Sequence, residues 1–185
     1  MKSPVKKAVD LIAAPTGMQP GGYVARAYAG RDEALTPRLE IEVARPPGSW
    51  RIRLRWPCPE PVRDVSRDPS LFPDAAAVFA PQAEASPWVT MGAAGLGVDG
   101  VLWRADAEHL IAIRAEGLGT MKRSDAPANW RFSAEHAGGF WRLDLTLPGW
   151  TTLDASGRLA AAIWRGAAKE RAGLKSVSPG WLEVS

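Results

Sequence analysis

Apolar and polar residues alternate along much of the chain, most clearly in two segments of its first third. In RLEIEVA, the apolar residues Leu39, Ile41 and Val43 fall on one side of an extended chain, and two glutamates fall on the other. In WRIRLRW (50–56), four apolar residues alternate in the same way with three arginines. A period of two is typical of half-buried strands. The arginine stripe is interpreted as the solvated face of a strand.

Further strands are expected where short apolar runs are bounded by Gly, Pro or Asp. Prolines at five positions between 57 and 73 exclude a central strand there, so a long loop is expected. About ten short strands with few or no helices predict an all-β fold, a two-sheet antiparallel β-sandwich. Residues 1–20 are expected to form an N-terminal extension, and residues 21–185 a single sandwich domain. The remaining strands are expected at 75–80, 100–105, 109–115, 129–137, 139–147, 158–166 and 181–185.

The cysteine and histidine content removes several classes of site. Cys58 is the only cysteine, so no disulfide, CxxC motif, iron–sulfur cluster or zinc–cysteine site can form within the chain. Covalently attached haem of the CxxCH type is excluded for the same reason. With only His109 and His136, a multi-histidine metal site is not expected. The net charge of +3 is mild and includes no Lys/Arg block of the nucleic-acid-binding kind.

The N-terminal segment MKSPVKKAVDLIAA has a basic start, but its apolar run is short and is interrupted by Asp10. Neither a signal peptide nor a membrane span is predicted from it. The protein is therefore expected in the cytoplasm, or in the periplasm if a leader has been removed.

One methionine, Met91, lies in a loop rich in Pro, Trp and Gly between two strand-like runs. Its neighbours include Trp88 and Gly92. Packing of the thioether on Trp88 is the more frequent fate of such a methionine. A functional role for Met91 therefore requires a partner elsewhere in the chain.

Several segments, in their order along the chain, resemble one known family. They are a strand ending at Trp56, an acidic, proline-rich loop leading into FPDAAAVFAP, the Met91–Gly92 dipeptide, GVLWRAD, AEGLGT, GGFWRLDLTLPG, and AIWRG followed by ERAGLKSVS. Over residues 36 to 183, this order resembles the small γ subunits of DMSO-reductase-type (type II) molybdenum enzymes. That family includes ethylbenzene dehydrogenase, dimethylsulfide dehydrogenase, selenate reductase and chlorate reductase. The resemblance implies an immunoglobulin- or DOMON-like sandwich that binds one non-covalent haem b.

The same resemblance implies a ligand pair and a set of partners. The haem iron of the family is held between a methionine thioether and a lysine amine, matched here by Met91 and by Lys175 of the KSVS segment. With both axial positions taken, such a haem transfers electrons and does not activate a substrate. Lysine coordinates a metal only as the neutral amine, so Lys175 is expected to lose its proton through burial. The implied partners are a molybdenum catalytic subunit and an iron–sulfur subunit in a heterotrimer, which in the family is usually periplasmic.

Other residues remain candidates for these roles. Lys122 is the alternative to Lys175 and Met121 the alternative to Met91, although the segment KRSD is typical of an exposed hairpin end. Histidine is a frequent haem ligand by residue type, but both histidines are expected at strand ends. The candidate walls of the haem pocket, each also a candidate for the sandwich core, are Trp88, Trp103, Phe140 and Trp164. The candidate partners of the haem propionates are Arg104, Arg165 and Arg171.

Two classes of function follow from these observations. The first is an electron-transfer subunit with one haem b, which is not an enzyme by itself. The second is a haem-free, tryptophan-rich sandwich that binds carbohydrate or a protein, and the nine tryptophans suit either class. A hydrolase is not supported, because the chain has no GxSxG motif and no suggestive pair of acidic residues.

Overall fold

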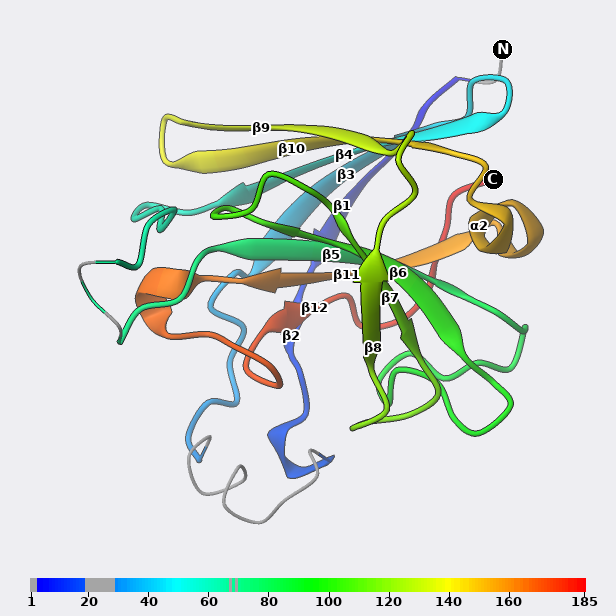
Figure 1. Cartoon of the computed structure of the whole chain (residues 1–185). Coiled ribbons are helices and arrows are strands. Elements are labelled where there is room, and N and C mark those ends of the chain that lie inside the picture. Colours follow the sequence, from blue (N-terminus) through cyan, green and yellow to red (C-terminus); the bar gives the residue numbers. More distant parts are fainter. Residues whose placement is uncertain (1–2, 19–28, 67, 69) are drawn as a thin grey trace.

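The computed structural model describes residues 3–18, 29–66, 68 and 70–185 and is a sandwich of two antiparallel sheets (Figure 1). The predicted all-β class is confirmed. Thirteen strands are present in this part of the chain, more than predicted, and three of them are only two residues long. The helical elements are η1 (Thr16–Met18), α2 (Thr151–Ser156) and η2 (Gly166–Ala168). The strands are β1 (Val5–Asp10), β2 (Ile12–Ala13), β3 (Arg38–Ala44), β4 (Ser49–Pro57), β5 (Ala75–Pro81), β6 (Val98–Arg104), β7 (Ile111–Ala115), β8 (Lys122–Asp125), β9 (Arg131–Ala137), β10 (Phe140–Pro148), β11 (Arg158–Trp164), β12 (Ser176–Val177) and β13 (Leu182–Glu183).

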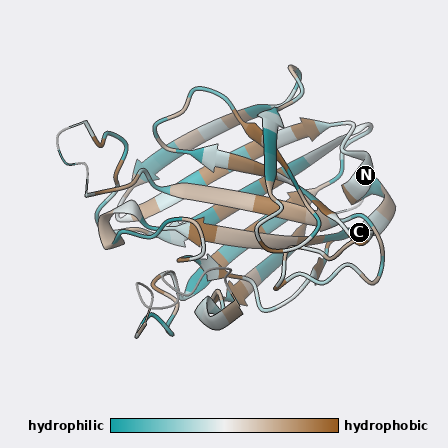
Figure 2. Cartoon of the chain, turned by 60° about the horizontal axis from the view of Figure 1, so that its bottom comes forward, coloured by the Kyte–Doolittle hydropathy of each residue, from teal (hydrophilic) through white to brown (hydrophobic). Residues whose placement is uncertain are grey.

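The first sheet has the order β1-β3-β4-β10-β9 and shows the predicted alternation (Figure 2). Its inner face packs apolar side chains into the sandwich core, where Leu54 and Leu143 are fully buried. Its outer face carries the arginine stripe, in which Arg53 lies 2.6 Å from Asp144 and Arg55 lies 3.0 Å from Glu40. The interpretation of this stripe as a solvated face is therefore confirmed.

The second sheet has the order β2-β12-β11-β5-β6-β7-β8, with β13 paired to β11. Every residue of β5 is buried, as are the five residues between the ends of β11. One face of β5, represented by Val78, packs into the core between the sheets. The other face, represented by Ala77 and Phe79, belongs to a second apolar cluster that includes Trp88 and Met91. Loops therefore cover the outer face of this sheet, and the candidate site lies beneath them.

The N-terminal segment corrects one prediction. All six residues of β1 pair with β3, and β2 pairs with β12, so residues 5–13 form part of the sandwich and not an extension. The alternation that places Val9 and Leu11 in the core is short, and two lysines obscure it in the sequence. The expected boundary at residues 20 and 21 lies outside the described residues. No helix within the described ranges is long and apolar enough to cross a membrane.

Candidate cofactor site between two loops

Met91 occupies the closing position of a tight turn between β5 and β6. The Met91 amide donates to the Trp88 carbonyl and the Gly92 amide donates to the Pro87 carbonyl, both at 2.8 Å. This pair of bonds is that of a Schellman turn, whose closing residue adopts the left-handed conformation and is usually glycine. Met91 adopts it with φ of 56°, followed by Gly92 with φ of 88°. A non-glycine residue held in this region is more common at functional sites.

One further hydrogen bond and the close packing of the backbone at Gly92 fix the Met91 turn on the sheet. The Gly117 amide donates to the Met91 carbonyl at 3.0 Å. A Cβ atom at Gly92 would lie 2.7 Å from the Leu96 carbonyl, so only glycine fits at this position without a shift of the backbone. The thioether of Met91 is therefore presented by a turn that is hydrogen-bonded on both sides, and Met91 is only 8% exposed.

Lys175 comes from the loop that joins β11 to β12. The indole N–H of Trp164 donates to the Ala172 carbonyl at 3.1 Å, and the Ala14 amide donates to the Lys175 carbonyl at 2.9 Å. Ala172 has a positive φ of 48°. The loop is therefore held in a specific shape by its contacts with β11 and with the N-terminal segment.

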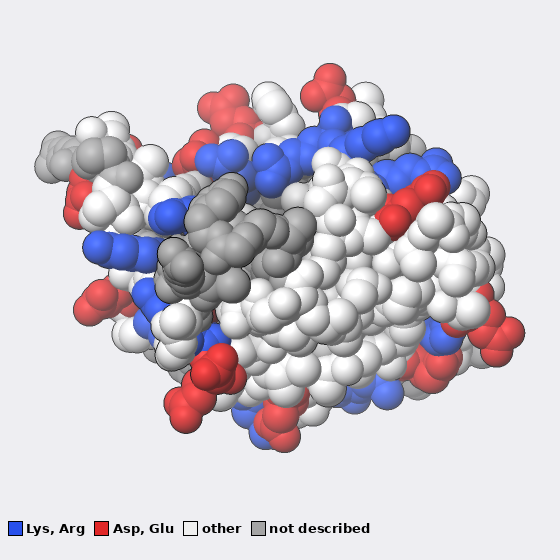
Figure 3. Space-filling model, turned by 90° about the horizontal axis from the view of Figure 1, so that it is seen from below, with Lys and Arg blue, Asp and Glu red and all other residues white. Residues whose placement is uncertain are grey.

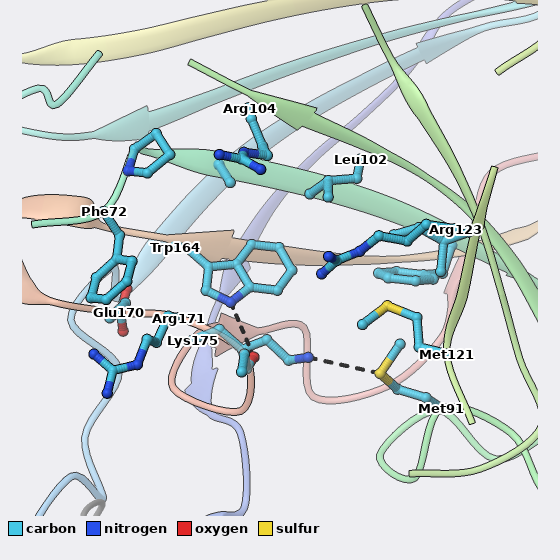
Figure 4. A pocket seen from close by; sticks show the side chains of 15 residues that line it. Phe72, Met91, Leu102, Arg104, Met121, Arg123, Trp164, Glu170, Arg171 and Lys175 are labelled. Atoms are coloured by element: carbon cyan, nitrogen blue, oxygen red, sulfur yellow. Dashed lines mark hydrogen bonds between the residues drawn. The ribbon is translucent and has the colours of Figure 1, made fainter. Parts of the chain in front are cut away.

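The two loops bring Met91 and Lys175 together. Lys175 Nζ lies 3.8 Å from Met91 Sδ, although the two residues are 84 positions apart in the sequence (Figure 4). The ammonium also lies 5.1 Å from the centroid of the Trp164 ring. Burial lowers the pKa of Lys175 from 10.5 to about 8, because the charged form loses its hydration. At this position a lysine gives up its proton far more readily than at the surface.

Both side chains line a cavity of about 260 Å³ on the outer face of the second sheet (Figure 4). Its floor is apolar and includes Ala75, Phe79 and Leu102. An apolar floor with a few convergent polar groups is typical of cofactor and ligand sites. Trp164, a candidate wall residue, and Arg171, a candidate partner of the propionates, also line this cavity.

The lining of the cavity includes more cationic side chains than acidic ones. Three arginines, Arg104, Arg123 and Arg171, line it. Arg104 is already engaged, because Asp106 accepts two hydrogen bonds from its guanidinium, at 3.0 and 2.7 Å. Seen from below, one edge of the molecule carries a row of Lys and Arg side chains, with Asp and Glu side chains beside it (Figure 3). Such surroundings favour a ligand with negatively charged groups.

The structure does not bring every predicted wall residue to the cavity. Trp88 belongs to the Met91 turn but does not line the cavity: its ring contacts Phe79, and its indole N–H donates to the Ser178 carbonyl at 2.8 Å. Trp103 instead packs between the sheets against Trp141, because an odd-numbered position of β6 points into the core. Phe140 lies on β10 in the other sheet, beneath the Arg55 guanidinium. Trp103 and Phe140 are therefore not walls of this cavity.

The alternative ligands and the third predicted arginine are also placed. Lys122 is exposed on β8 and does not line the cavity, whereas Met121 does. His136 hydrogen-bonds the Cys58 carbonyl at 2.7 Å, and His109 is exposed in a separate groove. Arg165 donates to the Leu35 carbonyl at 3.0 Å and does not line the cavity. In the described part of the chain, no group of three or more His, Cys, Asp or Glu residues is arranged to hold a metal ion.

Sequence reasoning missed Arg123, Phe72 and Glu170, which also line the cavity. Arg123 pairs with Ile113 across β7 and β8, so it shares the face on which Ile113 meets the cavity. The register that places it there was not visible in the polar segment KRSD. Glu170 is 4% exposed, and burial raises its pKa, although the Arg165 amide donates to it at 2.7 Å.

The donor set fits an axially ligated haem iron. A thioether and a neutralisable amine are ligands for a soft or borderline transition metal. Bonds of about 2.0 Å from a metal to nitrogen and about 2.3 Å to sulfur sum to roughly 4.3 Å. The 3.8 Å between Nζ and Sδ is within about half an ångström of that sum. The separation of these two atoms is therefore close to the one that a metal held between them would require.

Comparison with known proteins gives two curated relatives. The chain is 27% identical over 169 residues to "Dimethylsulfide dehydrogenase subunit gamma" of Rhodovulum sulfidophilum, an alignment that covers 82% of the chain. It is 32% identical over 182 residues to "Putative respiratory nitrate reductase heme subunit ORF7" of Haloferax mediterranei, which covers 92% of the chain. The chain spans 62% of the length of each relative. No protein-family model matches the chain.

Proposed function

We propose that this chain, which is similar to a dimethylsulfide dehydrogenase gamma subunit and to a putative nitrate reductase haem subunit, is an electron-transfer subunit of a molybdenum enzyme. We propose further that it holds one haem b, with Met91 and Lys175 as the two axial ligands. The predicted identity of these ligands stays a prediction, and the relatives support it only at the level of a haem subunit.

One observation carries the proposal. Two loops that are distant in the sequence place a thioether and an amine 3.8 Å apart at the edge of an apolar cavity. An ordinary surface lysine is hydrated and far from apolar walls. Lys175 instead has a pKa lowered to about 8 by burial, so the neutral amine needed for coordination is accessible near neutral pH.

The chain's own residues prepare this site for electron transfer. Haem supplies an iron that changes its charge by one electron, and a thioether ligand favours the reduced form. Met91 and Lys175 would together leave no axial position for oxygen or a substrate. The apolar floor, including Phe79 and Leu102, would limit the contact of water with a bound cofactor. Trp164 and the Met91 turn hold the two ligands in place before the cofactor binds.

The proposed partners follow from the relatives' names. Both names describe subunits, one of a dehydrogenase and one of a reductase, so a separate subunit is expected to carry the substrate chemistry. We propose that this chain relays electrons between the iron–sulfur subunit of a molybdenum enzyme and an external carrier. It would form a heterotrimer with the iron–sulfur and catalytic subunits and act in the same compartment as these partners.

Reconstitution with haem tests the ligand assignment. The apoprotein should take up one haem and give a six-coordinate, low-spin spectrum. Met91→Ala and Lys175→Ala should each abolish the low-spin signal. Met121→Ala, which removes a second thioether that lines the cavity, and Lys122→Ala, which removes an exposed lysine, are the matched controls and should leave the signal intact. Loss of the signal in a control variant but not in its counterpart would reverse the assignment.

The alternative function, a haem-free binding module, gains no support from the tryptophans. Carbohydrate-binding sandwiches use exposed aromatic faces for stacking. All nine tryptophans lie within the described residues, and each is buried or partly buried. The alternative would be established if this protein stayed colourless in the presence of excess haem and bound saccharides.

A further inference from the structure

We propose that Arg123 and Arg171 bind the two carboxylates of the cofactor, one arginine each, so that the haem enters with its propionates at the mouth of the cavity. This inference rests on the proposed function and deepens it, because it assigns an orientation to the cofactor. Of the three arginines that the sequence analysis gave as candidates, it keeps Arg171 and drops Arg104 and Arg165. It adds Arg123, which the sequence analysis had not named.

Arg123 approaches the mouth from the edge of the second sheet. It belongs to β8, whose four residues are all exposed, and it lies across from Ile113 of β7. Figure 4 shows its side chain extending from β8 toward Trp164. Arg123 forms no salt bridge with any residue in the described ranges. Its charge is therefore available to a ligand.

Arg171 lies on the loop that carries Lys175. Its guanidinium stacks on the Phe72 ring, with Cζ 4.6 Å from the ring centroid. Stacking fixes the plane of a guanidinium but leaves the N–H donors at its edge free, in a fork that matches a carboxylate. Among the residues that the structure describes, Arg171 also has no acidic partner within salt-bridge distance.

The other two candidate arginines are less suited to this role, each for a different reason. Arg104 lines the cavity, but Asp106 accepts two hydrogen bonds from it. A bidentate carboxylate partner of this kind uses the same fork that a propionate would need. Arg165 lies away from the cavity and donates to the Leu35 carbonyl.

The interior of the cavity disfavours carboxylates. Its floor is apolar, and transfer of an ionised carboxylate to such a surface without a partner is costly. Lys175 offers no positive charge once its amine coordinates iron. The two unpaired arginines are therefore the favourable location for the acidic groups.

A comparison of haem with haem dimethyl ester tests this inference. Both probes carry the same macrocycle and iron, but the ester has no negative charge. We expect Arg123→Gln and Arg171→Gln each to weaken the binding of haem by about threefold to tenfold, a size that reflects their solvent exposure. The double variant should lose roughly the product of the two factors. Binding of the dimethyl ester should be the same in the Arg123 and Arg171 variants as in the unmodified protein. Arg104→Gln removes a residue that lines the cavity but is already paired with Asp106, so it should affect the binding of haem and of its ester equally.

The possible outcomes separate the orientation from the function. If the Arg123 and Arg171 variants lose affinity equally for haem and for its ester, the arginines only shape the cavity and the inference is wrong. If Arg104→Gln is the only variant that weakens the binding of haem without weakening the binding of its ester, the propionates lie at Arg104. The assigned orientation is then overturned. If the unmodified apoprotein binds neither probe, the proposed function itself fails. Raising the salt concentration should reduce the effect of the Arg123 and Arg171 substitutions on haem affinity, because salt screens the charges of exposed arginines.

Discussion

Lys175 has to meet two opposing demands. It must be buried to approach the Met91 thioether, and burial of an ammonium group is unfavourable. A cation–π contact with Trp164, whose ring centroid lies 5.1 Å from Nζ, offsets part of this unfavourable free energy. The rest of the cost of burying the Lys175 ammonium remains in the apoprotein. Binding of a metal to the neutral amine would remove that cost, because the amine then carries no proton. A residue that destabilises the empty protein is a common sign of function.

The first prediction is that Lys175→Met stabilises the apoprotein at neutral pH. The folded-state pKa is lowered from 10.5 to about 8, so the penalty of the charged lysine is fully present below pH 8 and disappears as pH rises to 10.5. A shift of this size corresponds to at most roughly 3 kcal/mol of unfolding free energy. Urea unfolding of both proteins at pH 7 and above pH 10 measures it.

Other titrating groups are common to both proteins and cancel in the comparison. The advantage of Lys175→Met should therefore shrink as the pH rises and vanish above about pH 10.5. A variant that is less stable than the unmodified protein at pH 7 would show that the lysine stabilises the apoprotein instead. The same variant should give no low-spin haem signal, which separates stability from function.

The second prediction concerns Trp164, which positions Lys175. Trp164→Phe keeps an aromatic face near the amine but loses the hydrogen bond to the Ala172 carbonyl. Loss of one such bond is worth about 1 kcal/mol, so haem affinity should fall roughly fivefold. Trp164→Leu should fall further, because it also loses the ring. The measurement is a haem titration followed by the low-spin absorption signal.

Trp130→Phe is the matched control for this change. The Trp130 indole also donates to a backbone carbonyl, that of Pro148, at 3.1 Å, but it lies outside the cavity. This variant should lose a similar amount of stability without a change in haem affinity. Equal losses of affinity in both variants would mean that the effect is one of general stability.

Among the elements, the turn that presents Met91 is the one most constrained by its backbone. The left-handed conformation of Met91 is unfavourable for a residue with a Cβ atom and natural for glycine. The third prediction is that Met91→Gly is more stable than Met91→Ala by about 0.5–1 kcal/mol, although both lose the thioether. Denaturant unfolding of the two apoproteins gives the difference directly.

Val89 in the same turn provides the opposite case. It is not among the residues with a positive φ. There Gly should be less stable than Ala, by about 0.5–1 kcal/mol. If Gly and Ala rank the same way at positions 89 and 91, the turn does not impose a left-handed conformation on Met91 in solution.

The strands differ in how far the sequence specifies them. In β3, β4 and β10, a strict alternation of apolar and charged residues determines both the extended conformation and the inward face, so these strands were predicted almost to their ends. In β5 and β11 the apolar runs predict a strand but not what covers its second face, because no polar residue marks a solvent side. That second face is the floor of the candidate site, and it became visible only in the structure.

The candidate site was predictable to a similarly limited extent. Nothing in the spacing of Met91 and Lys175 indicates that residues 84 positions apart meet, and their pairing was expected only from the resemblance to a family. Trp103 was left as a candidate for both the pocket wall and the sandwich core, because a single tryptophan in a strand gives no information about which face is the core. Arg123 was missed because the edge strand β8 has no apolar pattern that sets its register.

At the scale of the whole molecule, one buried carboxylate joins the two sheets to the loops of the site. Asp74 is fully buried at the start of β5. It accepts hydrogen bonds from the Trp141 indole in the opposite sheet at 2.8 Å, from the Gly166 amide in η2 at 2.7 Å and from the Val62 amide at 2.9 Å. At η2 the Phe72 carbonyl packs so closely that a side chain in place of Gly166 would not fit. Asp74 therefore fixes the proline-rich loop and the start of the Lys175 loop relative to the sandwich.

The fourth prediction is that Asp74→Ala lowers the unfolding free energy by about 3–5 kcal/mol, because several buried donors lose their acceptor at once. Asp144→Ala is the control, since its two arginine partners lie on the solvated face and its loss should cost no more than about 1 kcal/mol. Denaturant unfolding of the apoproteins compares them. If Asp74 also fixes the Lys175 loop, the Asp74 variant should bind haem more weakly under conditions where it remains folded, whereas the Asp144 variant should not. Normal haem binding in a folded but destabilised Asp74→Ala protein would show that the site depends on its two loops alone and not on this link between the sheets.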